Sequence, residues 1–152
     1  MNPYLRFGLM LATSFVVMYA AMFTNVDQFD HIMLSYTRTY MTIIMVAPMA
    51  IIMLLYMWKM YENKKMNYLI IALAVVLTAG TYHLMRQQIP IGDKAWMKAM
   101  IPHHSSAIMV SQKAHLKDPE AQQLAKEIIE AQKREIAEMK KMLYRLEHGT
   151  TE

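Results

Sequence analysis

Three long apolar segments constrain this 152-residue chain more than any other feature of its sequence. They cover about residues 4–23, 40–60 and 68–85, and none carries more than one charged side chain. A helix rises about 1.5 Å per residue, so about 20 apolar residues cross the roughly 30 Å of hydrocarbon in a bilayer. The sequence therefore predicts three transmembrane helices. We expect the first to be retained rather than cleaved, because its apolar run is long and no clean cleavage site follows it.

The distribution of charge divides the chain into two parts. Most of the Lys, Arg, Asp and Glu side chains follow residue 92. We predict two domains, which are a three-span transmembrane anchor over residues 1–88 and an extracytoplasmic helical hairpin over residues 92–148. The formal net charge is +4, but the C-terminal lysines alternate with glutamates, as on a solvated helix face. We therefore expect no nucleic-acid partner.

Basic residues near the predicted spans indicate how the chain is oriented. Arg6 lies near the start of the first span and three lysines lie in the second connection, whereas the first connection carries Asp27 and Asp30 with one arginine. Basic residues favour the cytoplasmic side of a membrane. We predict a bacterial inner (plasma) membrane protein that has a cytoplasmic N-terminus and an extracytoplasmic C-terminal domain, with the lipid bilayer as a partner.

Capping signals predict two helices after the third span. The Pro- and Gly-containing segment 89–92 ends the span, and Asp93 can cap the helix that follows. Asp118 as N-cap and Pro119 in the first helical position start a second helix, for which Gly149 is the stop. The predicted fold class is all-α, with three transmembrane helices followed by a helical hairpin.

Candidate ligands for a soft metal ion lie on the predicted hairpin. Met100 and His104 are four residues apart, so they share one helix face, and His103 is adjacent. Thioether and imidazole ligands suit Cu(I) or Ag(I) better than Mg²⁺ or Ca²⁺. The expected inward stripe of the first helix is Met97, Met100, His104 and Ala107. That of the second is Leu124, Ile128, Gln132, Glu135, Met139 and Met142. Spacing alone leaves a metal site and ordinary packing as alternatives.

The chain contains 18 methionines and no cysteine, which excludes disulfides, thiolate nucleophiles and cysteine-ligated zinc. Five methionines recur every four residues along the second span, where we expect helix packing or lipid contact rather than a metal relay: Met41, Met45, Met49, Met53 and Met57. Neither an E-x-x-H nor an H-E-x-x-H motif occurs, which argues against a di-iron enzyme or a zinc hydrolase. We therefore predict no enzymatic activity.

Two motifs of the hairpin resemble a known family. They read M-I-P-H-H-S-S-A-I over residues 100–108 and I-I-E-A-Q-K-R-E-I-A-E-M over residues 128–139. Both resemble the domain-of-unknown-function 305 family, a bacterial family that includes periplasmic copper-binding proteins of the CopM type. The likeness covers about residues 92–147, and the N-terminal half resembles the membrane-anchored branch of that family.

The resemblance implies a ferritin-like helical fold and the binding of copper or silver, with Cu(I) favoured and Ag(I) as an alternative. The family positions carried over to this chain are Met100, His103, His104, Gln132, Glu135 and Met139. One position departs from the family pattern. Val110 stands where the family usually has methionine, and Met109 lies one place earlier.

Three functions remain as alternatives at this point. The first is a membrane-tethered copper- or silver-binding protein of metal homeostasis or resistance. The second is a structural protein whose hairpin self-associates as a homo-oligomer into a four-helix bundle, with or without metal between protomers. The third is a metal transporter. It is the least expected of the three, because three spans are few for an ion path and no charged residue lines them. Asp27, Asp30, His31 and Met33 form a candidate second metal site in the first connection.

Overall fold

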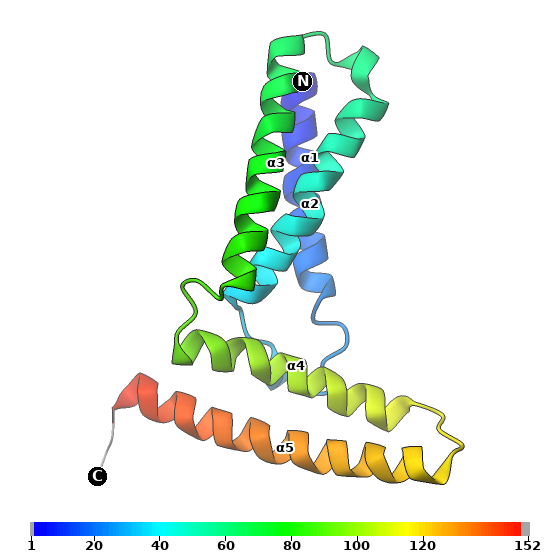
Figure 1. Cartoon of the computed structure of the whole chain (residues 1–152), viewed down its shortest axis with the longest axis vertical. Coiled ribbons are helices and arrows are strands. Elements are labelled where there is room, and N and C mark those ends of the chain that lie inside the picture. The colour runs from blue at the N-terminus through cyan, green and yellow to red at the C-terminus, as the bar shows by residue number, and fades with distance from the viewer. Residues whose placement is uncertain (1, 150–152) are drawn as a thin grey trace. The chain divides into compact units, whose positions relative to one another are not determined.

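The computed structural model describes residues 2–149, which form helices and no strands (Figure 1). The five α-helices are α1 (Pro3–Ala21), α2 (Tyr36–Tyr56), α3 (Lys64–Arg86), α4 (Asp93–Lys113) and α5 (Pro119–His148). Two short 3-10 helices are η1 (Phe29–His31) and η2 (Trp58–Met60). The all-α prediction is confirmed, whereas the ferritin-like character of the hairpin stays a prediction.

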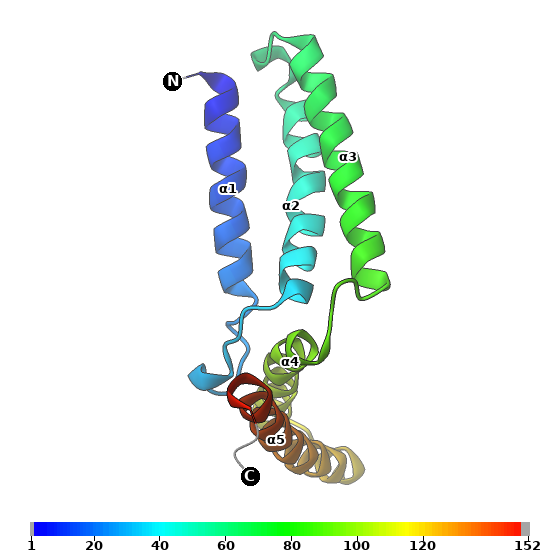
Figure 2. The ribbon, with the colours of Figure 1, turned by 90° about the vertical axis from the view of Figure 1, so that its left-hand side faces the viewer.

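Helices α1, α2 and α3 are each long and apolar enough to cross a membrane, as the sequence predicts. They contain 19, 21 and 23 residues, close to the number that spans a hydrocarbon core. Figure 2 shows the three helices running along a common direction. Few of their side chains are buried within the chain, which is expected for helices whose apolar surface faces lipid.

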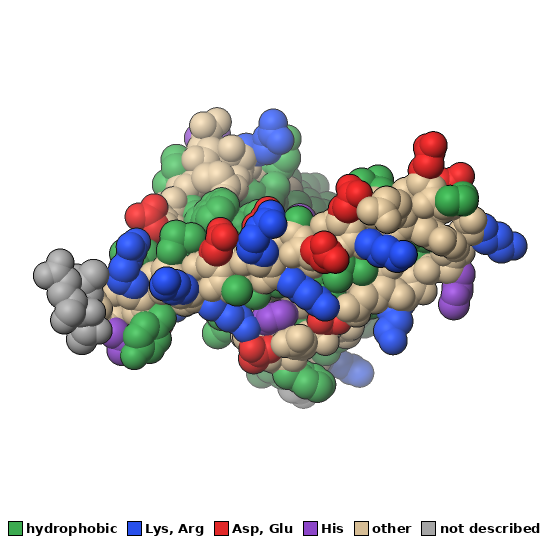
Figure 3. All heavy atoms as spheres, turned by 90° about the horizontal axis from the view of Figure 1, so that it is seen from below, with side chains coloured by type: hydrophobic (Ala, Val, Ile, Leu, Met, Phe, Trp, Pro, Cys, Tyr) green, Lys and Arg blue, Asp and Glu red, His purple; other side chains and the backbone are tan. Residues whose placement is uncertain are grey.

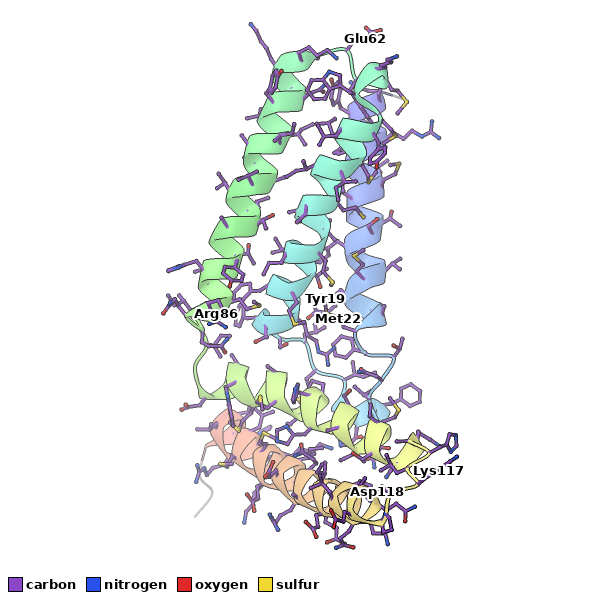
Figure 4. All side chains as sticks on the ribbon, turned by 45° about the vertical axis from the view of Figure 1, so that its right-hand side comes forward. Tyr19, Met22, Glu62, Arg86, Lys117 and Asp118 are labelled. Atoms are coloured by element: carbon purple, nitrogen blue, oxygen red, sulfur yellow. The ribbon has the colours of Figure 1, made fainter. Side chains whose placement is uncertain are left out.

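One end of the three-helix unit is held together by an aromatic and polar cluster. Phe7 of α1 packs against Tyr61, which follows η2, with ring centroids 5.5 Å apart. The Tyr4 hydroxyl donates to Oδ1 of Asn67 at 2.8 Å, and the Asn67 amide donates to the Tyr61 carbonyl at 2.9 Å. This cluster lies at the same end as Glu62, in the connection from α2 to α3 (Figure 4).

Two of the five regularly spaced methionines of the second span pack on a core, and two are exposed. Met53 of α2 and Met57, which follows that helix, pack against the apolar core of the three-helix unit. Met41 and Met45 are exposed on the surface of the helix, where lipid contact is expected for a transmembrane segment.

The described chain forms two compact units. The first contains the residues up to Met22 together with Thr37–Pro90, and the second contains Phe23–Tyr36 together with the residues from Ile91 onwards. The second unit resumes at Ile91, after the third span. The first connection, Phe23–Tyr36, packs with the C-terminal hairpin, which the sequence-based division did not foresee.

The ends of α5 confirm the capping predictions. The Asp118 carboxylate accepts the N–H of Ala121 at 2.9 Å, in the α4–α5 connection labelled in Figure 4. Gly149 follows the helix with a φ of 77°, a conformation that favours glycine. The N-cap expected for α4 was wrong. Gly92 occupies that position without a side-chain hydrogen bond, and Asp93 is the first helical residue.

The buried faces of the hairpin are rotated from the predicted stripes. The buried side chains of α4 are Met97, Ile101, Pro102, Ser105 and Ile108, and those of α5 are Ile136, Met139 and Leu143. Leu124 and Met142, both expected inside, are 57% and 39% exposed. Apolar residues border both stripes, so the packing partner decides which face is buried. Helix α4 contacts both α5 and η1, so side chains that face either of them are buried, and not only those that face α5.

Candidate functional site

His104 is a partly buried side chain of the predicted ligand set. Its side chain is 11% exposed, and its Nε2 lies 2.7 Å from Oε2 of Glu135 on α5. An ionised carboxylate can only accept a hydrogen bond, so Nε2 carries the proton, and a neutral ring then has its lone pair on Nδ1. That Nδ1 is buried, and within residues 2–149 no hydrogen-bond partner reaches it. A buried nitrogen in this state is uncommon and calls for a physical reason.

The Nδ1 atom of His104 has the features of a metal ligand. A metal-bound histidine typically coordinates through one nitrogen while its other N–H donates to a carboxylate, which fixes the tautomer and the ring orientation. Glu135 provides that carboxylate. No three His, Asp or Glu side chains among the described residues form a group that could hold a metal ion. Any ion at His104 would therefore need ligands of another type.

Methionine sulfur is the other ligand type close to this pair. Met100 lies one turn before His104 on α4, and Met139 lies one turn after Glu135 on α5. The two helices run antiparallel and His104 contacts Glu135. The residue four places before His104 therefore lies opposite the residue four places after Glu135, so Met100 and Met139 are at the same level of the hairpin. Met139 is accordingly buried in the core of the hairpin, and Met100 packs against that core.

His103 and Gln132 are less embedded than the other predicted ligands. The His103 side chain is exposed, and its ring centroid is 6.0 Å from that of His104. Gln132 is partly buried on α5, one turn before the buried Ile136. The structure thus separates the two histidines into one inward and one outward side chain, because successive helical residues point about 100° apart.

Ser105 is a buried polar residue that the sequence analysis missed. Its hydroxyl accepts the backbone N–H of Asp27 at 2.8 Å and lies 2.8 Å from Nδ1 of His31. Burial is the main cause that lowers the pKa of His31 and Lys140 adds to it, whereas Asp30 and Asp27 oppose it. Since the serine is fully buried, the pair ties the first connection to α4 and offers no nucleophile to a substrate. The sequence feature that could have identified Ser105 is its spacing, because it falls among the buried positions of α4.

The side chains of the candidate second metal site have other partners. Lys140 donates to Oδ2 of Asp30 at 2.5 Å, and this hydrogen bond is the main cause that lowers the pKa of Asp30. The His31 ring lies 3.8 Å from Asp30 and bonds to Ser105. Met33 packs against the apolar core of the hairpin. The positive charge of Lys140 beside Asp30 disfavours a cation at this place.

Comparisons with known proteins identify relatives of the chain. The family described as Domain of unknown function (DUF305) matches residues 75–143, which include both hairpin motifs. The uncharacterized protein L153 of Acanthamoeba polyphaga mimivirus is 35% identical over 138 residues, and the alignment covers 89% of each chain. No solved structure matches the chain. On the strength of these two matches, this protein belongs to the DUF305 family.

Proposed function

We propose that this protein is a membrane-tethered copper- or silver-binding protein of metal homeostasis or resistance. The observation that carries the proposal is the buried Nδ1 of His104, which lacks a partner within residues 2–149 while Glu135 holds the other ring nitrogen. Met100 and Met139 supply thioether sulfur beside this pair. An imidazole combined with thioethers suits Cu(I) or Ag(I) better than harder cations.

His103 and Gln132 have supporting roles in this proposal. His103 is exposed next to His104, so it can contact an ion that arrives from solvent. Gln132 is partly buried on α5, one turn before Ile136. Its side chain can serve as a further ligand or hold another ligand in place. When bound, the ion would satisfy the Nδ1 lone pair that the fold otherwise leaves unpaired.

The anchor would place this site at a membrane surface. Lysines in the connection that contains Glu62 support a cytoplasmic position for that connection. With three spans, the first connection and the hairpin would then both lie on the extracytoplasmic side. The proposed location is a bacterial inner (plasma) membrane, where an exposed site meets copper before the ion enters the cell.

A Cu(I) titration of the purified full-length protein in detergent tests the proposal, with a coloured chelator as competitor. We expect the wild-type protein to take copper from the chelator, and the variant His103→Ala/His104→Ala to lose this ability. His115→Ala, an exposed histidine in the α4–α5 connection, is the matched control and should bind as the wild type does. Equal affinity and stoichiometry in the wild type and the double variant would refute the proposal.

Exposed apolar side chains support a second candidate function, which is self-association of the hairpin. The large exposed side chains of α4 and α5 are Trp96, Val110, Leu124, Met142, Tyr144 and Leu146. Figure 3 shows hydrophobic side chains between charged ones on the face of the molecule seen from below. Exposed apolar patches often mark interaction surfaces, and two hairpins could form a four-helix bundle. A metal-independent oligomer that binds no copper, measured by size in detergent, would favour this function over the first.

A further inference from the structure

Met33 of the first connection lies against the same core as the proposed ligands. The core cluster of the hairpin, with the side chains packed on it, contains four methionines, which are Met33, Met97, Met100 and Met139. All of its other members are isoleucine or leucine. Thioether sulfur is therefore the ligand atom type that this cluster offers to a soft metal ion.

Met33 is turned inward while its more hydrophobic neighbours are exposed, which is not expected if the segment only fills an apolar core. Side chains alternate around it, with His31, Met33 and Ser35 turned inward and partly or fully buried. The exposed side chains between them are Ile32, Leu34 and Tyr36, at 41%, 73% and 52%. Isoleucine and leucine are more often buried than methionine, so a segment chosen only to fill a core would turn the other way. This inverted pattern favours a chemical role for the inward face.

Hydrogen bonds fix this segment at two points beside the proposed ligands. His31 and the Asp27 backbone bind the hydroxyl of Ser105, the residue that follows His104. Asp30 binds Lys140, the residue that follows Met139. The first connection is thus held to both helices of the hairpin without a metal ion, which keeps Met33 in place before an ion arrives.

We propose that Met33 is a thioether ligand of the copper or silver site, so that the site is built from the first connection as well as from α4 and α5. This inference rests on the proposed function and adds a ligand that lies outside the two hairpin motifs. It assigns the first connection a direct part in metal binding.

The test replaces the sulfur of Met33 and keeps its volume. Met33→Leu is a volume-conserving change with a small cost in stability, which thermal unfolding in detergent will check. We expect the Cu(I) affinity to fall about tenfold or more, which equals about 1.4 kcal/mol of binding free energy per factor of ten. Met142→Leu, an exposed methionine of α5, is the control and should keep the wild-type affinity. Met33→Cys restores a soft sulfur ligand in a chain without cysteine and should recover binding.

The outcomes separate this inference from the proposed function. Wild-type affinity in Met33→Leu, together with lost binding in His103→Ala/His104→Ala, would overturn the role of Met33 and leave the proposed function standing. Weak binding in Met33→Leu that Met33→Cys does not recover would also count against a ligand role. A wild-type protein that takes up no Cu(I) would overturn both.

Discussion

At the scale of single residues, the bond between His104 and Glu135 determines which chemistry the hairpin offers. The carboxylate selects the tautomer with the proton on Nε2, which leaves a buried lone pair on Nδ1. Leaving a buried polar atom unpaired costs stability, about 1–3 kcal/mol in typical proteins. In the proposed function, a bound ion would recover that cost.

Replacing Glu135 by glutamine should weaken metal binding without removing it. The amide oxygen of glutamine can still accept the Nε2 proton, but a neutral acceptor holds the imidazole less strongly than an ionised one. We expect the Cu(I) affinity of Glu135→Gln to fall by about 10- to 100-fold, as for other residues that orient a metal-bound histidine. Competition titration measures this, with Glu138→Gln on the exposed face of α5 as control. An unchanged affinity would show that the carboxylate plays no part.

The buried His31 should make the metal-free protein less stable in mild acid. Burial and Lys140 lower its pKa, so the folded state favours the neutral ring more than the unfolded state does. This contribution is fully present above the unfolded pKa of about 6.5 and is lost as the pH falls from there through the lower folded pKa. We expect the melting temperature to drop between pH 7.5 and 5, and to drop less in His31→Gln. Equal slopes in the two proteins would contradict this expectation.

At the scale of elements, the ends of helices could be predicted from the sequence, whereas the helix face that is buried by tertiary packing could not. The Asp118 cap and the Gly149 stop are decided by nearby backbone groups, so the sequence predicts them correctly. The buried face of α5 depends on what packs against it, and Leu124 and Met142 were placed on the wrong side for that reason. His104, Glu135 and Met139 were predicted as neighbours, and the structure brings the first two into direct contact.

The packing of the first connection on the hairpin could not be predicted from spacing, because it joins segments far apart in the chain. Asp27 and Ser105 are separated by 78 residues, yet one hydrogen bond links them. Met33 was predicted only as part of a separate candidate site in the first connection, since no sequence spacing relates it to the hairpin motifs. The one local sign was Ser105 itself. A serine at a buried helical position needs a hydrogen-bond partner for its hydroxyl from another segment.

Removing the Ser105 hydroxyl should loosen the first connection. In Ser105→Ala, the Asp27 N–H and the His31 ring both lose a buried partner, each at a cost of about 1–3 kcal/mol. Ser106→Ala is the neighbouring control, because the bond from Asn25 to Ser106 is exposed and water can replace it. Chemical unfolding in detergent should show a clearly larger loss for Ser105→Ala. Similar losses in the two variants would indicate that the buried hydroxyl contributes little to stability.

At the scale of the whole molecule, three spans require that the connection between α2 and α3 and the connection between α4 and α5 lie on opposite sides of the membrane. Glu62 lies in the first of these connections and Lys117 in the second (Figure 4). The chain contains no cysteine, so a single introduced thiol can be labelled without background. Its transmembrane arrangement is thus open to a direct chemical test.

Two single-cysteine variants test the orientation. We expect a membrane-impermeant maleimide to label Lys117→Cys on intact cells and to label Glu62→Cys only after the membrane is permeabilised, because lysines flank Glu62 and favour the cytoplasmic side. The reverse pattern would place the hairpin in the cytoplasm. Labelling of both variants on intact cells would contradict a three-span anchor.

Metal binding by imidazole and thioether together is tested most directly by X-ray absorption at the copper edge of the Cu(I)-loaded full-length protein. Because the chain has no cysteine, any sulfur in the first coordination shell must come from methionine. We predict a mixed shell of sulfur and nitrogen, with the nitrogen contribution reduced in His104→Ala and the sulfur contribution reduced in Met33→Leu. A shell of nitrogen and oxygen alone, or a protein that retains no copper, would contradict this assignment.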